Sequence, residues 1–147
     1  RFERFVLVDP FAYAPWYFRL FTWPLLGRVA FWSTFANPLG RWLANLSLAR
    51  HRQEGTHLTH TFAGIPSEVA WQSLRLLVEI GEPARYGALQ RPTMIVHGER
   101  TFAAVRRSLQ RWRQIWPQVD VREAAGAGHL PLLENPAAVA DALHTVP

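Results

Sequence analysis

The chain has 147 residues, no cysteine and a formal net charge of +5. This length suits one domain or part of one, and a hydrophobic share of 49% against 18% charged residues excludes a disordered chain. The lack of cysteine excludes disulfides, thiolate metal sites and a thiol nucleophile. All 16 basic residues are arginines scattered along the chain, a pattern that does not indicate nucleic-acid binding.

The first predicted element is a short strand at Phe5–Val8, which stops at Asp9-Pro10. A continuous apolar run of this length is typical of a strand that is buried on both faces of a parallel sheet. Residues 15–50 are rich in aromatic side chains and interrupted by proline and glycine, so they predict short helices broken by turns. A polar loop and one longer helix follow, at residues 51–66 and 66–80.

The second half of the chain alternates strands and helices. Strands are predicted at residues 93–96 and 119–122, and helices at residues 102–116 and from Pro136 onward. Such alternation predicts an α/β fold, in which helices cover a parallel sheet. The stretch between the first two strands exceeds any ordinary crossover, so it must form a lid or subdomain.

We therefore expect a core strand in residues 1–10, an inserted helical cap or lid in residues 11–90, and the rest of the core in residues 91–147. Three strands leave the first one as an apolar edge, so the sheet reads as part of a larger sheet whose earlier strands are missing. Residues 11–35 are interrupted by prolines and arginines, and no run approaches the roughly 20 apolar residues of a membrane-spanning helix. Residues 1–8 do not resemble a signal peptide, and we expect a soluble, cytoplasmic protein.

Four stretches of the chain resemble the C-terminal half of the α/β-hydrolase fold family. Residues 5–10 resemble the strand that follows the nucleophile-bearing strand, and residues 15–40 resemble the helical cap. Residues 91–100 are similar to the penultimate strand and its exit, and residues 126–134 (Gly-Ala-Gly-His-Leu-Pro-Leu-Leu-Glu) to the loop of the catalytic histidine. The resemblance implies hydrolysis of an ester or similar bond in an apolar small molecule, through a catalytic triad that needs no cofactor and no metal.

The resemblance makes His129 the candidate catalytic base. A general base has to lie above the strand ends, where it can reach a nucleophile and be oriented by a carboxylate. A glycine-flanked histidine directly after a strand satisfies this requirement, and Glu134 to Pro136 near the start of the next helix fix the loop on its other side. The alternative is a loop histidine with an ordinary hydrogen bond.

The acid of the triad has two candidates. The family's usual position, just after the penultimate strand, is occupied by Thr101, which cannot ionise. Asp9 and Glu99 both follow strands whose carboxyl ends share one edge of the sheet. We favour Asp9, because some members of the family place their acid after this strand. Its alternative role is a turn cap, and Glu99 reads more simply as a surface residue.

The nucleophile is the part of the triad that this sequence lacks. No serine is framed by glycines as G-x-S-x-G; the serines are Ser33, Ser47, Ser67, Ser73 and Ser108. Since the family's order is nucleophile, acid, histidine, we expect the nucleophile upstream of Arg1 and this chain alone to be inactive. We also expect it to self-associate or to pair with the missing N-terminal half. The alternative is a non-catalytic, hydrolase-derived binding or interaction protein, which Thr101 at the acid position favours.

Two weaker features remain. The aromatic side chains of residues 16–35 form either the lining of an apolar substrate pocket or the core of the cap itself, and a third option is a lid that lies on a lipid surface. His51, His57 and His60 are near enough in sequence to share a metal ion. Because Glu54 is the only acidic residue nearby, we predict no metal site.

Overall fold

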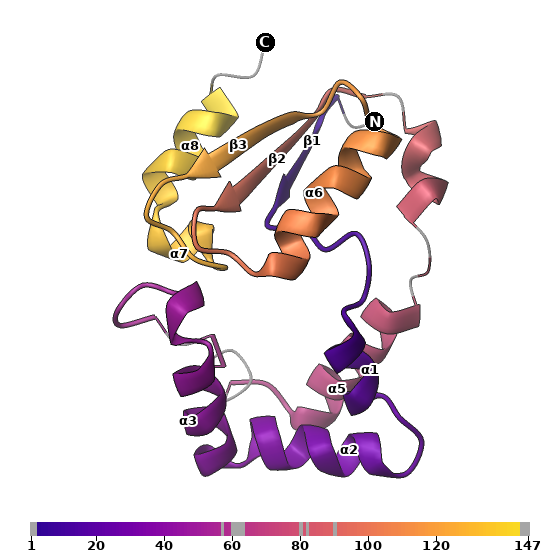
Figure 1. Cartoon of the computed structure of the whole chain (residues 1–147), viewed down its shortest axis with the longest axis vertical. Coiled ribbons are helices and arrows are strands. Elements are labelled where there is room, and N and C mark those ends of the chain that lie inside the picture. The colour runs from indigo at the N-terminus through magenta and orange to yellow at the C-terminus, as the bar shows by residue number, and fades with distance from the viewer. Residues whose placement is uncertain are drawn as a thin grey trace. The chain divides into compact units, whose positions relative to one another are not determined.

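The computed structural model of the chain describes residues 3–56, 58–59, 64–79, 81, 83–89 and 91–144. Contacts divide the chain into two compact units, which Figure 1 shows. The sheet unit comprises residues 1–12, 50–56 and 82–147, and the helical unit comprises residues 13–49 and 57–81, in each case as far as they are described.

The sheet unit is built on three parallel strands, β1 (Phe5–Val8), β2 (Thr93–Gly98) and β3 (Asp120–Ala124), in the order β1-β2-β3 (Figure 1). Val8 of β1 pairs with Val96 of β2. The central strand is buried at every position, whereas β1 is only half-buried. The predicted burial of β1 on both faces is therefore wrong for this chain, because β1 lies at an edge of the described sheet.

Helices cover the sheet on both sides, as an α/β fold requires (Figure 1). Met94 and Val96 pack against Val139 of α8 (Pro136–His144), and Ile95 between them points to the opposite face, because side chains alternate along a strand. The helix on the opposite face of the sheet is α6 (Ala103–Ile115), which corresponds to the helix predicted at residues 102–116. It buries its apolar stripe and exposes its arginines, which are Arg106, Arg107, Arg111 and Arg113.

Three short helical segments complete the sheet unit. The turn η2 (Ala49–His51) begins the segment that returns from the helical unit, and η3 (Pro83–Ala88) precedes β2. The helix α7 (Pro131–Glu134) follows the predicted histidine loop and has Pro131 in its first turn. It was not among the predicted elements, because four residues are too few to show a helical period.

The helical unit contains the short helices that residues 15–50 predict, followed by a longer one. They are α1 (Trp16–Phe21), α2 (Leu26–Phe31), the π-helical turn η1 (Trp32–Ala36), α3 (Pro38–Ser47) and α5 (Ser67–Glu79). The start of α3 has an evident cause, because Pro38 occupies its first turn and the side chain of Asn37 accepts a hydrogen bond from the Leu39 amide at 2.9 Å.

The aromatic side chains of the helical unit divide into core and surface. Phe21, Phe31 and Phe35 pack with ring centroids 5.0 to 6.2 Å apart, and Phe31 is fully buried. In contrast, Trp16 and Trp23 are 71% and 61% exposed. The core interpretation therefore holds for the phenylalanines and does not hold for these two tryptophans.

The compact units do not follow the boundaries at residues 10 and 90. Residues 50–56 lie within the predicted cap, yet their contacts group them with the sheet unit. The interpretation of the helical unit as a cap stays a prediction. None of the described helices is long and apolar enough to cross a membrane.

Candidate active site

The carboxyl ends of the three strands bring three loops to one edge of the sheet. Asp9 directly follows β1, Gly98 ends β2, and the loop from Gly126 to His129 follows β3. Because the strands are parallel, their exits meet, and this edge is where open α/β sheets hold their ligands.

Asp9 is a buried carboxylate, and both of its oxygens accept hydrogen bonds. Its backbone has a positive φ of 50°, a region that aspartate tolerates better than most residues, and its amide donates to the Val96 carbonyl at 2.8 Å. Oδ1 accepts a hydrogen bond from the Gly98 amide at 3.0 Å, and Oδ2 accepts one from the hydroxyl of Thr101. These donors compensate for the removal of the charge from water.

His129 lies against the same carboxylate. Its Nδ1 contacts Oδ2 of Asp9, and an ionised carboxylate only accepts hydrogen bonds, so Nδ1 carries the proton of the neutral ring. Nε2 then holds the lone pair, which is the arrangement of a general base. The His129 side chain is 22% exposed and that of Asp9 3%, so the imidazole can be reached from outside while the carboxylate cannot.

Two phenylalanines flank the imidazole. The ring of Phe102 lies 4.4 Å from that of His129 between centroids, and Phe11 lies 5.5 Å away. Contact with these two rings limits the rotation of the imidazole, so the hydrogen bond to Asp9 costs less side-chain entropy. These contacts also make the surroundings of the base apolar.

The glycines of this edge are required by close backbone approaches. A Cβ added at Gly98 would lie 1.8 Å from the carbonyl oxygen of Gly128, and one at Gly128 would lie 2.1 Å from that of His51. Gly126 has a φ of +70°, a conformation that side chains disfavour. In the Gly-Ala-Gly-His run, Gly126 is therefore required by its backbone conformation and Gly128 by close packing.

The structure separates the two acid candidates. Asp9 contacts His129, whereas the exposed Glu99 accepts a hydrogen bond from the Gly126 amide at 2.7 Å and so anchors the loop. Thr101, at the family's usual acid position, is 2% exposed and donates to the carboxylate of Asp9. The threonine therefore supports the carboxylate that directly follows the neighbouring strand.

Two contacts of the histidine loop are not predicted by the sequence. The His51 carbonyl accepts a hydrogen bond from the His129 amide at 2.9 Å, and the Gln53 side chain donates to the Gly126 carbonyl at 3.0 Å. These partners are more than 70 residues apart in sequence, and no local pattern marks them.

The sheet unit itself supplies no serine nucleophile to this edge. Ser108 is the only serine in the sheet unit; it is fully buried, donates to the Ala104 carbonyl and accepts from the Ala12 amide. Among the described residues no group of three or more possible metal ligands is found. His57 and His60, named above as metal candidates with His51, lie outside the described residues.

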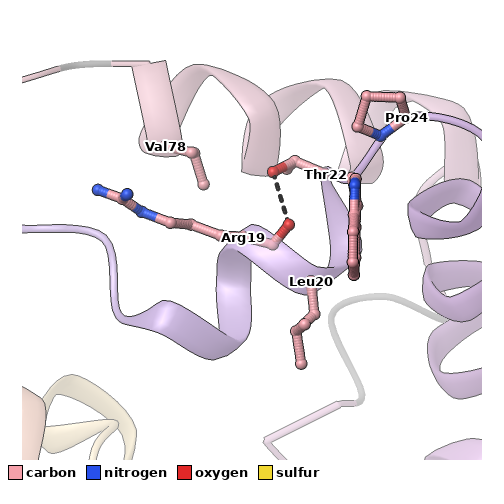
Figure 2. A pocket seen from close by; sticks show the side chains of 6 residues that line it. Arg19, Leu20, Thr22, Pro24 and Val78 are labelled. Atoms are coloured by element: carbon pink, nitrogen blue, oxygen red, sulfur yellow. Dashed lines mark hydrogen bonds between the residues drawn. The ribbon is translucent and has the colours of Figure 1, made fainter.

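A shallow pocket lies within the helical unit and is shown in Figure 2. It is lined by Arg19, Leu20, Thr22, Trp23, Pro24 and Val78. The hydroxyl of Thr22 donates to the Arg19 carbonyl at 3.1 Å, so it is already engaged. The lining offers apolar contact and a guanidinium, and it contains neither a nucleophile nor a base.

The parallel sheet with helices on both faces is an α/β fold, and the carboxylate–histidine pair lies at its carboxyl edge. Comparison with known proteins gives the family. A family model described as "Alpha/beta hydrolase family" matches residues 1–142. The chain belongs to the alpha/beta hydrolase family, as the resemblance predicted. Among curated protein sequences no significant match is found.

Several solved hydrolase structures share the fold. An esterase from Thermogutta terrifontis matches 97% of this chain and 54% of its own, with a TM-score of 0.64 and 22% identity. An enol-lactonase from Burkholderia xenovorans matches 98% and 55%, with a TM-score of 0.67 and 12% identity. A carboxylesterase from Nitrososphaera gargenis matches 97% and 54%, with a TM-score of 0.64 and 13% identity. At these identities the likeness shows the fold, and the chain spans about half the length of these relatives.

Proposed function

We propose that this chain carries the acid–base pair of an ester hydrolase, with His129 as the general base and Asp9 as the carboxylate that orients it. The observation that carries the proposal is the contact of the buried Asp9 carboxylate with Nδ1 of His129. It leaves Nε2 with a lone pair on a partly exposed ring, which is what base catalysis requires.

The chemistry follows from that arrangement. Nε2 of His129 takes the proton of a serine hydroxyl as the serine oxygen bonds to the ester carbonyl carbon. When the bond from that carbon to the leaving oxygen breaks, Nε2 returns the proton to the departing alcohol. Water repeats the two steps on the acyl-enzyme and releases the acid. Asp9 stabilises the imidazolium that forms in each half.

The serine itself belongs to another part of the hydrolase fold in this proposal. None of the serines of the chain is framed by glycines, and the chain spans about half the length of its structural relatives. The 147 residues on their own are therefore expected to be inactive. The acid–base mechanism requires neither a metal nor a cofactor.

The proposed substrate class is an apolar ester or lactone of small size. Phe11 and Phe102 give the base an apolar surrounding, and the similar structures are described as esterases and an enol-lactonase. The helical unit, with exposed tryptophans such as Trp16 and Trp23, is proposed as the cap that selects the substrate.

A hydrolase-derived binding protein is the second candidate. The observation in its favour is the lack of a glycine-framed serine in the 147 residues. The presence of Thr101 at the family's usual acid position does not favour a binding protein, because the threonine supports the carboxylate that contacts His129.

Turnover of a chromogenic ester by the full protein separates the candidates. We expect His129→Ala and Asp9→Asn to lower kcat by about 10³- to 10⁴-fold each. The matched controls are His144→Ala and Asp120→Asn, which change exposed residues of the same types. Wild-type turnover by His129→Ala, or no hydrolysis by the unmodified protein, would contradict the enzyme proposal and favour a binding role.

A further inference from the structure

We propose that residues 50–56 hold the catalytic histidine in place, with Gln53 and Glu134 as positioning residues. We call residues 50–56 the bridging segment, because the chain enters it from the helical unit and returns there afterwards, while its own contacts lie in the sheet unit. The inference rests on the proposed role of His129 as the base.

The backbone of the bridging segment is joined directly to His129. The His129 amide donates to the His51 carbonyl at 2.9 Å. The approach is so close that a Cβ on Gly128 would lie 2.1 Å from that oxygen and 2.7 Å from the Cα of Arg52. The main chain that leads into His129 is thus held by the bridging segment.

The carboxylate of Glu134 ties the same two stretches together. Oε1 accepts a hydrogen bond from the Gln53 amide at 2.9 Å, and Oε2 accepts one from the Gly128 amide. Bonds to a charged acceptor are stronger than neutral ones. The Gln53 side chain adds a third tie through its donation to the Gly126 carbonyl at 3.0 Å.

The bridging segment also supports the aromatic wall of the imidazole. The ring of His51 lies 4.8 Å from that of Phe102, and Phe102 in turn lies 4.4 Å from that of His129. The carbonyl of Arg100 can only accept, so Nδ1 of His51 donates to it, at 3.0 Å, and this fixes the ring. The bridging segment therefore contacts His129 directly through the His51 carbonyl and indirectly through the ring of Phe102.

This arrangement links the position of the base to contacts outside the triad. The loop after β3 carries His129, and a displacement of about 1 Å would take Nδ1 out of range of Asp9 and cost on the order of 100-fold in rate. Glu134 and Gln53 act through the loop backbone, so their loss should lower kcat and leave KM unchanged.

Two variants and one control test the proposal in the full ¹⁵N-labelled protein. Glu134→Gln replaces an accepting oxygen by an amide donor, and Gln53→Ala removes one neutral tie. Glu54→Ala, an exposed neighbour, is the control. We measure hydrogen exchange of the Gly128 and His129 amides, the NMR signal of the His129 Nδ1 proton, and kcat.

We expect the two amides to exchange about 10- to 100-fold faster in Glu134→Gln and about 3- to 10-fold faster in Gln53→Ala. The Nδ1 proton signal should weaken in the same order, kcat should fall at constant KM, and the amides of β2 should be unchanged. The control should match the wild type. The mild Gln53→Ala change keeps the test decisive if Glu134→Gln does not fold.

Wild-type exchange and kcat in both variants would overturn the proposal. Equal acceleration in β2 would also overturn it, because the residues would then serve general stability. Failure of the proposed function has a different signature: the exchange changes would be present while His129→Ala leaves turnover unaltered.

Discussion

Asp9 and Thr101 meet at the carboxyl edge of the sheet, where the hydroxyl of Thr101 donates to the buried carboxylate of Asp9. Oδ2 of Asp9 receives both the hydroxyl of Thr101 and Nδ1 of His129, and Oδ1 receives the Gly98 amide. The Gly98 amide and the Thr101 hydroxyl therefore fix the orientation of the carboxylate independently of His129. Thr101, at the position where the family's acid is expected, therefore supports the carboxylate that follows the neighbouring strand.

At the residue scale we expect Thr101→Val to weaken this arrangement. The change keeps the shape of the side chain and removes a donor to a buried charge, which should lower the free energy of unfolding by about 1–3 kcal/mol. Urea unfolding measures it. Thr101→Ser, which keeps the hydroxyl, should lose less than half as much. Equal stability of Thr101→Val and the wild type would show that the hydroxyl does not support Asp9.

At the element scale, the exit of β2 fits against the loop after β3 only because residue 98 is glycine. The Cβ of Gly98→Ala would lie 1.8 Å from the Gly128 carbonyl, and backbone cannot yield as a flexible side chain can. We expect a loss of about 1–3 kcal/mol in unfolding free energy and a displaced His129. Thermal unfolding and the His129 Nδ1 proton signal measure the two effects.

Gly87→Ala is the matched control for this change. Its Cβ would have its nearest neighbour, Cγ2 of Ile115, at 3.9 Å, and its φ is not positive. We expect it to be neutral or up to about 1 kcal/mol more stable, because alanine reduces the entropy of the unfolded chain. If the two alanine variants were equally stable, the close approach of Gly98 to the histidine loop would not be a constraint.

Elements whose signal is local could be predicted from the sequence. The apolar run of β2 and the helical period of α6 are contained in a few consecutive residues, and both elements lie where those patterns place them. The pairing of His129 with Asp9 was predictable only because a family resemblance placed both residues at strand exits. The ties of Gln53 and Glu134 were not predictable, since 81 residues separate them.

At the scale of the whole molecule, β1 leaves a strand edge unpaired and the helical unit leaves apolar side chains exposed among the described residues. β1 pairs with β2 alone in the described sheet, and α3 exposes an apolar stripe made of Leu39, Trp42, Leu43 and Leu46. Open strand edges and large apolar patches promote association. The family's fold offers one explanation, because the chain spans about half the length of its structural relatives.

We expect the isolated 147-residue chain to self-associate at micromolar concentration. Sedimentation velocity measures this, with 16.8 kDa as the mass of the monomer. A single monomeric species across the concentration range would contradict the expectation and would indicate that the exposed apolar side chains are tolerated in solution.

The most direct test of the Asp9–His129 pair is a double-mutant cycle on ester turnover by the full protein. Groups that act as a unit are not additive, so the variant that combines Asp9→Asn with His129→Ala should be no slower than His129→Ala alone. That result means that Asp9 acts only through the imidazole. A double variant whose loss in kcat equals the product of the two single losses would show that the residues act independently, and would contradict the acid–base pair.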